Sequence, residues 1–466
     1  ASETADAGKE VFALVPHSVF RGPDNNPEVS GIQALARKTY SHHYYMNATP
    51  EIRDVDIART GGKLSSFSPS LASDWRTLLV VGQGKGGRSF VAMDVTSISS
   101  TVSESDIAGR VLWEFTHPDM GFSFGRPLIA KTARWGWVVV LTGGYNNVNG
   151  TKAGQGVIFV LNAKTGALLG SAPVYTGSGT ALSPAGLAQI EGYTPSYQDY
   201  TLDYVYGGDL DGNLWRFDFT SADNDLPAVK KIAEFIEDGV GQPVTTAPKV
   251  EYSAEDLKRY VFVGTGRLLE NVDLTNSKQQ TMYAVRDGTK SRAYGSDTHQ
   301  LALPSGISFP VRRGNMSKVT DLLSGAKLSE ATPMGWYYDL TGRDTTSTTG
   351  VAATERIILN LQANDGVLTW AGTIMNSDPC SITGTARLYS VQYGTGQSVF
   401  YKIVDGLRSQ TEWLNIDAGL ADTTLLRVGS SIRVLGTDVK GASKIYGSTI
   451  AESGEPRVVN WRVIRE

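Results

Sequence analysis

The chain has 466 residues, with 43 lysines and arginines against 47 aspartates and glutamates, a net charge of −4 and one cysteine, Cys380. This balance argues against a protein that binds nucleic acid by neutralising phosphates, and without a run of about 18 apolar residues we expect no transmembrane segment. A single cysteine excludes an intramolecular disulfide and a multi-cysteine metal site. The 51 glycines exceed an average share of about 7% and indicate many tight turns.

Short runs rich in Val, Ile, Tyr, Phe and Trp, bounded by Gly, Asn, Asp or Ser, dominate the chain and predict strands. In the first half these strands are residues 77–81, 89–95, 111–115, 136–142, 157–161, 204–206 and 214–219. In the second half they are residues 260–263, 281–285, 356–361, 366–373, 387–392, 398–404, 432–436 and 458–463. Helical periodicity is confined to residues 32–36 and 317–328. The sequence therefore predicts an all-β fold.

A paired-strand pattern recurs along the chain. In each copy one strand ends in glycine and the next ends at an acidic or amide residue, namely Asp94, Asn162, Asp218 and Asp287. Such a repeat is typical of β-propeller blades, four-stranded sheets that bury both faces against their neighbours. At roughly 55 to 70 residues per blade the chain holds about seven blades. We expect one propeller domain over residues 1–466, with residues 1–60 as an irregular lead-in that packs on it.

Two further patterns suggest ligand sites but have plainer explanations. Residues 82–87 match the G-x-G-x-x-G fingerprint of dinucleotide sites, yet a strand follows where that fingerprint needs a helix, so we interpret them as a hairpin loop. None of the five histidines pairs with a nucleophile in a known catalytic motif, and the adjacent His42 and His43 would point to opposite sides of a strand. We expect structural or surface roles for them.

Residues 209–213, Asp-Leu-Asp-Gly-Asn, are similar to the opening of a calcium loop, in which alternate side chains direct oxygens at one cation. The twelfth position of such a loop needs a bidentate acid, and here it is Thr220. An Asp-Gly turn in a β-hairpin explains the same residues, and we favour the turn.

Motifs spread over most of the chain resemble the C-terminal propeller domain of the PilY/PilC family of proteins at the tip of type IV pili. They are residues 11–16, 74–80, 82–87, 91–96, 112–115, 121–127, 143–146, 203–209, 212–218 and 263–267. The resemblance implies a modified seven-bladed propeller, similar in shape to quinoprotein dehydrogenases but not an enzyme. The family's usual N-terminal half, often von Willebrand A-like, is not part of this sequence, so we expect a mature form or an excised domain.

The function that the resemblance implies is pilus biogenesis and adhesion. Such a domain supports pilus extension against retraction, and with it twitching motility, attachment to surfaces or host cells, and virulence. The implied partners are minor pilins, pilus assembly proteins and a host or abiotic surface. The implied location is the bacterial cell surface, at the pilus tip or the outer membrane, reached through the periplasm.

The resemblance also implies one metal candidate, Asp203. Members of the family often carry a calcium loop of the form D-x-D-x-N-x-V-x-D, and here only its closing acid, Asp203, is present. The preceding residues 191–202 are rich in tyrosine and offer too few carboxylates for six or more oxygen ligands, which argues against calcium. Asp199 and the 209–213 segment are hypothetical substitutes. We expect no organic cofactor.

Alternatives remain at this point. Tyr193, Tyr197 and Tyr200 suit contact with a partner but equally suit packing over the edge of a blade. A dehydrogenase with a quinone cofactor (PQQ type) is the alternative function, because residues 160–166 resemble the repeat of that fold. Such enzymes usually place two adjacent cysteines over the cofactor, whereas Cys380 stands alone. A lectin-like adhesin is a third interpretation.

Overall fold

The structure is a computed structural model that describes residues 10–99, 102–196, 198–329, 331–344, 353–376, 384–404, 407–428 and 431–450. The chain divides into two compact units, Ala1–Lys231 with Ser296–His299, and Ile232–Gly295 with Gln300–Glu466. Each unit is described by itself. The strand predicted at residues 458–463 lies outside the described residues.

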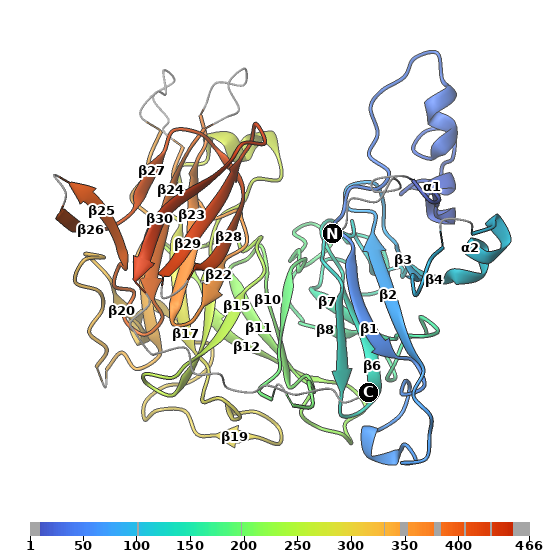
Figure 1. Ribbon diagram of the computed structural model, residues 1–466, viewed down its shortest axis with the longest axis horizontal. Helices are drawn as coiled ribbons and strands as arrows, with labels where there is room; N and C mark the ends of the chain where they lie inside the picture. The colour runs from blue at the N-terminus through green and yellow to red at the C-terminus, as the bar shows by residue number, and fades with distance from the viewer. Residues whose placement is uncertain are drawn as a thin grey trace. The chain divides into compact units, whose positions relative to one another are not determined.

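The first unit is built from three four-stranded sheets, each formed by strands that are consecutive in the chain (Figure 1). The first sheet contains β1 (Glu51–Asp56), β2 (Trp75–Gly82), β3 (Phe90–Asp94) and β4 (Val111–Phe115). The second contains β5 (Leu128–Thr132), β6 (Gly136–Thr142), β7 (Val157–Asn162) and β8 (Val174–Tyr175). The third contains β9 (Ile190–Tyr193), β10 (Tyr204–Gly208), β11 (Asn213–Asp218) and β12 (Ala228–Glu234), whose last three residues are assigned to the second unit.

The inner strands of these sheets are buried on both faces. Every residue of β6 is buried. Val138 and Val140 pack in the cluster shared with the sheet β9–β12, whereas Val139 and Leu141 pack in the cluster shared with the sheet β1–β4. Because successive side chains of a strand point to opposite faces, β6 holds its two neighbouring sheets together. Each such side chain contributes about 1.5 to 3 kcal/mol of burial free energy.

The second unit repeats this arrangement with more irregular edges. A five-stranded sheet has the order β15-β16-β17-β21-β20, a four-stranded sheet the order β22-β23-β24-β27, and a second five-stranded sheet the order β26-β25-β30-β29-β28. The strands are β13 (Ile236–Glu237), β14 (Val240–Gly241), β15 (Lys249–Ser253), β16 (Lys258–Gly264), β17 (Thr281–Arg286), β18 (Ala293–Tyr294), β19 (Gln300–Leu301), β20 (Ser317–Lys318), β21 (Gly335–Asp339), β22 (Gln362–Asn364), β23 (Val367–Ile374), β24 (Thr385–Gln392), β25 (Phe400–Val404), β26 (Leu407–Thr411), β27 (Leu414–Ile416), β28 (Leu420–Val428), β29 (Ser431–Asp438) and β30 (Ser443–Ile450).

The all-β class predicted from the sequence is confirmed, and the described residues form six sheets of four or five strands and two of two strands. Most of the predicted strands within the described residues overlap an observed strand. The number of seven blades and the single domain over residues 1–466 stay predictions.

The lead-in is shorter than predicted. Residues 10–50, called the lead-in from here on, contain α1 (His17–Arg21) and the 3₁₀ helix η1 (Ile32–Ala36), and β1 begins at Glu51, inside the segment predicted to be irregular up to residue 60. The sequence of β1, Glu-Ile-Arg-Asp-Val-Asp, is mostly charged and only its last two residues are buried. Its pairing with β2 along the whole strand explains why it forms.

Two predicted elements are wrong. Residues 317–328 do not form a helix, because the Asp321 side chain accepts hydrogen bonds from the Leu323 N–H and the Ser324 hydroxyl, and Gly325 adopts a left-handed φ of 69°. These contacts close a turn directly after β20. Residues 356–361 do not form a strand either, since only an isolated bridge joins Arg356 to the neighbouring sheet.

A partly buried ion-pair network joins β17, β20 and β21 in the second unit. The Asp339 carboxylate, at the end of β21, lies 2.6 Å from Arg313 Nη2 and 2.9 Å from Lys318 Nζ, and it accepts a hydrogen bond from the Thr281 hydroxyl at 2.8 Å. Burial by itself raises the pKa of Asp339, but the hydrogen bonds from Lys318 and Arg313 outweigh it, and the pKa lies below its usual range.

Replacing Asp339 by asparagine is expected to lower the free energy of unfolding at pH 7 by about 1.5 to 3 kcal/mol, the contribution of hydrogen bonds to a charged group. A carboxyl with a lowered pKa stabilises the folded state above its unfolded pKa, and this stabilisation is lost as the pH falls through the folded value. The difference between the two proteins should therefore shrink below about pH 4. Urea unfolding between pH 3 and pH 7 measures it.

Asp365→Asn is the matched control, because Asp365 is 46% exposed and its ion pair with Arg427 lies on the surface. Asp365→Asn should lower the free energy of unfolding by less than about 1 kcal/mol at every pH. An Asp339→Asn cost that is equally small, or that does not change with pH, would contradict the role assigned to the network.

Candidate functional site

Asp203, the metal candidate, lies in the connection between β9 and β10. Its backbone N–H donates to the Tyr193 carbonyl at 3.0 Å and its own carbonyl accepts from the Phe219 N–H at 2.8 Å. The side chain is largely buried, with 12% of its surface exposed, and one carboxylate oxygen lies 3.6 Å from His299 Nδ1. The neighbour at this distance is an imidazole, which is not the oxygen ligand that calcium requires.

The 209–213 segment is the turn between β10 and β11, so the hairpin interpretation is confirmed. Asp209 is completely buried, and its carboxylate accepts hydrogen bonds from the Asp211 N–H, the Asn213 N–H and the indole N–H of Trp215, at 2.8 to 3.0 Å. Gly212 adopts a left-handed φ of 83°, as such a turn requires. Both oxygens of Asp209 therefore face N–H donors, and the residue closes the hairpin.

The donor set around Asp203 does not fit calcium. Calcium takes six to eight oxygen ligands, but Asp209 already accepts from N–H groups, and one oxygen of Asp199 accepts from the Thr201 N–H at 2.9 Å. In the part of the chain that the structure describes, no three His, Cys, Asp or Glu side chains gather in a way that could hold a metal ion. Asp199 and the 209–213 segment therefore do not supply the oxygen ligands that the missing calcium loop would provide.

Two roles were considered for the tyrosine-rich segment, contact with a partner and packing over the edge of a blade, and its tyrosines differ in which of them they fit. Tyr193 is the last residue of β9 and is 8% exposed, so it packs within the sheet. Tyr200 is 49% exposed and adopts a positive φ of 55°, which places it on the surface of the connection. Tyr197 lies outside the described residues.

The 82–87 loop joins β2 to β3, as predicted for a hairpin. Its glycines allow the lead-in to approach closely. A Cβ atom on Gly84 would lie 2.3 Å from Asn47 Oδ1, and one on Gly86 would lie 2.2 Å from the Tyr45 carbonyl oxygen. These glycines serve the packing of the lead-in, and β3 follows them instead of a helix.

The two adjacent histidines have separate neighbours. The His42 ring meets the Tyr44 ring edge-on with centroids 4.8 Å apart, and His43 Nε2 lies 3.1 Å from the Ser41 hydroxyl. Cys380, on which the objection to a quinone enzyme depends, lies outside the described residues.

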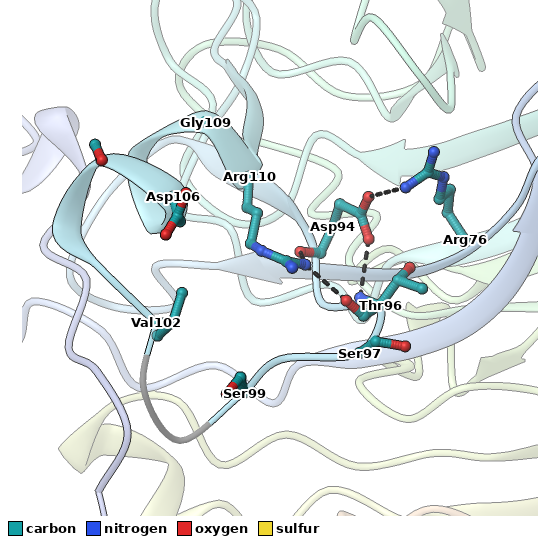
Figure 2. A pocket seen from close by; sticks show the side chains of 10 residues that line it. Arg76, Asp94, Thr96, Ser97, Ser99, Val102, Asp106, Gly109 and Arg110 are labelled. Atoms are coloured by element: carbon teal, nitrogen blue, oxygen red, sulfur yellow. Dashed lines mark hydrogen bonds and ion pairs between the residues drawn. The ribbon is translucent and has the colours of Figure 1, made fainter.

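A groove of about 770 Å³ opens between the end of β3 and the helix α2 (Glu104–Arg110), and is called the α2 groove (Figure 2). Figure 2 shows Asp94 between Arg76 and Thr96, with the Arg110 side chain reaching toward Thr96. Arg76 lies 3.4 Å from the Asp94 carboxylate, and Arg110 donates to the Thr96 carbonyl at 2.7 Å. Arg76 remains 42% exposed, so the groove offers contact groups. Its lining combines arginine, aspartate and small hydroxyl side chains.

The sequence analysis missed α2, although a signal was present. Ser103 and Asp106 form a capping box, in which each side chain receives the backbone N–H of the other residue. The spacing Ser-x-x-Asp is the pattern that predicts such a start.

Comparisons with known proteins bear on this arrangement. A family model described as the PilY1 beta-propeller domain matches residues 3–302. The type IV pilus biogenesis factor PilY1 of Pseudomonas aeruginosa is 26% identical over an alignment that covers 97% of this chain and 38% of that protein. A PilY1 homolog from Xylella fastidiosa is 29% identical, covering 72% of this chain and 21% of that protein.

The solved structure of the Pseudomonas aeruginosa PilY1 C-terminal domain is similar to this one with a TM-score of 0.63 at 21% identity, covering 95% of this chain and 89% of that chain. This similarity, together with the family model, confirms the predicted propeller class. None of these matches is a quinone-dependent dehydrogenase, so that alternative gains no support. No helix among the described residues has the length and apolar character needed to cross a membrane.

Replacing Asp209 by alanine is expected to lower the free energy of unfolding by about 2 to 5 kcal/mol, because several buried N–H donors lose their acceptor at once. Thermal or urea unfolding of the purified chain measures this loss. Asp223→Ala is the control, since the Asp223 side chain is 82% exposed and pairs only at the surface with Lys63. A cost no larger than that of the control would contradict the structural role of Asp209.

Proposed function

Because the chain belongs to the PilY1 β-propeller domain family, we propose that it is the propeller part of a type IV pilus biogenesis factor. The observation that carries the proposal is an alignment with the Pseudomonas aeruginosa factor over 97% of this chain. The chain spans 38% of that factor and 21% of the Xylella fastidiosa homolog, so the proposal concerns the contribution of this part.

The proposed role is mechanical and adhesive. The domain would support extension of the pilus against retraction, and thereby twitching motility and attachment to surfaces or host cells. Two features support this role. Inner strands that are buried on both faces, such as β6, make a rigid platform, and the α2 groove, with a volume of about 770 Å³, carries charged and polar contact groups.

The proposed partners are pilus components, in particular minor pilins, and a host or abiotic surface. The proposed location is the bacterial cell surface at the pilus tip. Exposed aromatic side chains support a contact role, because tyrosine offers area and a hydroxyl group for protein recognition. Tyr200 is 49% exposed, and Tyr40 and Tyr44 in the lead-in are 52% and 45% exposed.

We also propose that this domain binds no calcium at Asp203 and holds no organic cofactor. Calorimetric titration of the chain with calcium should give no saturable heat, and Asp203→Asn should behave as the wild type, because the neighbouring carboxylates already accept N–H donors. A saturable heat that disappears in Asp203→Asn would establish a calcium site and overturn this part of the proposal.

Deleting the coding region of this domain in the source bacterium should remove surface pili and twitching motility, because extension would no longer balance retraction. Removing the retraction motor as well should restore surface pili. Electron microscopy and sheared-pilus yields measure both outcomes. Normal piliation and motility after the deletion would contradict the assembly role.

A further inference from the structure

A second cavity of the first unit, about 450 Å³ in volume, lies where four segments meet and is called the Arg88 pocket. The lead-in supplies residues between His17 and Asn25, and the β2–β3 loop supplies Gln83, Arg88 and Ser89. The end of β4 with its following turn supplies residues between Glu114 and Met120, and the β6–β7 connection supplies Asn149. All of these segments are described by the structure, and the cavity is separate from Asp203 and from the α2 groove.

The walls of the pocket are built by specific contacts. Both oxygens of Glu114 accept backbone N–H groups at the start of α1, from His17 at 2.6 Å and from Ser18 at 3.2 Å. The Ser18 hydroxyl lies 2.8 Å from the Ser89 hydroxyl. Glu114 therefore holds the lead-in against the sheet, and both of its carboxylate oxygens are used in that contact.

Two N–H donors of the lining have no acceptor. Gln83 is 3% exposed, its Oε1 accepts from the Ser89 hydroxyl at 2.7 Å, and its Nε2 donates to none of the described residues. Arg88 Nε is likewise buried without an acceptor in the described part of the chain. Buried donors of native proteins are nearly always paired, so the two donors of this cavity are candidates to bind an external acceptor, either a water molecule or a ligand oxygen.

The arrangement of these donors is preorganised. Arg88 Nη1 donates to the Asn146 carbonyl at 2.9 Å, and the guanidinium lies over the Phe122 ring at 4.8 Å from its centroid. The Gln83 amide lies against Gly87, where a Cβ atom would come within 2.0 Å of Gln83 Oε1. The glycine is required for the amide to take this position.

His117 also lines the pocket, and its Nδ1 accepts a hydrogen bond from the Asp119 N–H at 3.1 Å. The charged side chains of the lining are Arg21, Arg88 and Glu114. The Asp24 carboxylate, next to the lining residues Pro23 and Asn25, acts electrostatically on Arg88 and offsets part of this positive charge. The N–H donors of a guanidinium and an amide suit a ligand group with two acceptor oxygens, and guanidinium groups match carboxylates in this way.

We propose that the Arg88 pocket binds the carboxylate of an acidic monosaccharide. The cavity is large enough to hold a sugar ring, and the polar residues Ser18, Asn25, Thr116 and Asn149 line it together with Phe115. These groups suit the hydroxyls and the apolar face of a sugar, whereas the carboxylate pairs with Arg88 and Gln83. The inference adds a ligand class to the proposed adhesive role, and binding by the purified chain tests it independently of piliation.

The test is calorimetry or saturation-transfer NMR on the full 466-residue chain with four probes: glucuronate, methyl glucoside, N-acetylglutamate and inorganic phosphate. Glucuronate should bind at least about tenfold more tightly than methyl glucoside, since the neutral sugar lacks the group that the donors recognise. Equal binding of N-acetylglutamate would overturn the choice of a sugar, and tighter binding of phosphate would overturn the choice of a carboxylate. No binding of any carboxylated probe would overturn the whole inference.

Two substitutions test whether the ligand binds in the Arg88 pocket. Gln83→Glu puts a like charge beside the ligand, and Arg88→Lys removes the Nε donor while keeping the charge, so each should weaken glucuronate binding by about tenfold or more. Arg76→Gln in the α2 groove is the matched control and should bind as the wild type. Thermal unfolding confirms that each variant is folded. Unchanged affinity in both folded pocket variants would overturn the assignment.

Discussion

Burial of the inner strands on both faces is the constraint on which the rest of this structure depends. In β6, Val138 and Val140 belong to one core and Val139 and Leu141 to the next. A sheet that is apolar on both faces cannot be stable alone in water, so each sheet needs a neighbour on either side. Close approach of neighbouring sheets follows, as at Gly192 in β9, where a Cβ atom would lie 3.0 Å from Leu128 Cδ2 in β5.

Because of the same constraint, polar side chains that could bind a ligand lie mainly at the ends of the strands. With both faces of a sheet buried, polar side chains find solvent or partners mainly in hairpins and connections, where binding residues concentrate in rigid scaffolds. Asp209 shows the structural use of such an end, because its buried carboxylate closes the β10–β11 hairpin. Gln83 and Arg88 occupy the corresponding hairpin between β2 and β3, but each keeps a donor without an acceptor among the described residues.

The sequence predicts most reliably the strands whose position is determined by burial of apolar side chains. The predicted strand at residues 136–142 coincides with β6 because its apolar run is continuous, whereas charged, half-exposed β1 was missed because backbone pairing decides it. The helix predicted at residues 317–328 failed because apolar spacing cannot reveal that Asp321 closes a turn. Asp203 was proposed from family resemblance alone. No local pattern predicts the Arg88 pocket, since its walls come from four segments that only folding brings together.

The position of the lead-in links the pocket to the fold. Glu114 accepts the first backbone N–H groups of α1, and this contact, which docks the start of the lead-in, forms part of one wall of the cavity. The pocket therefore exists only while the lead-in is docked. A ligand that touches both Arg88 and the lead-in binds that docked state alone, and by linkage it must stabilise the docking as much as the docking favours the ligand. Ligand binding at the Arg88 pocket and docking of the lead-in are therefore thermodynamically coupled.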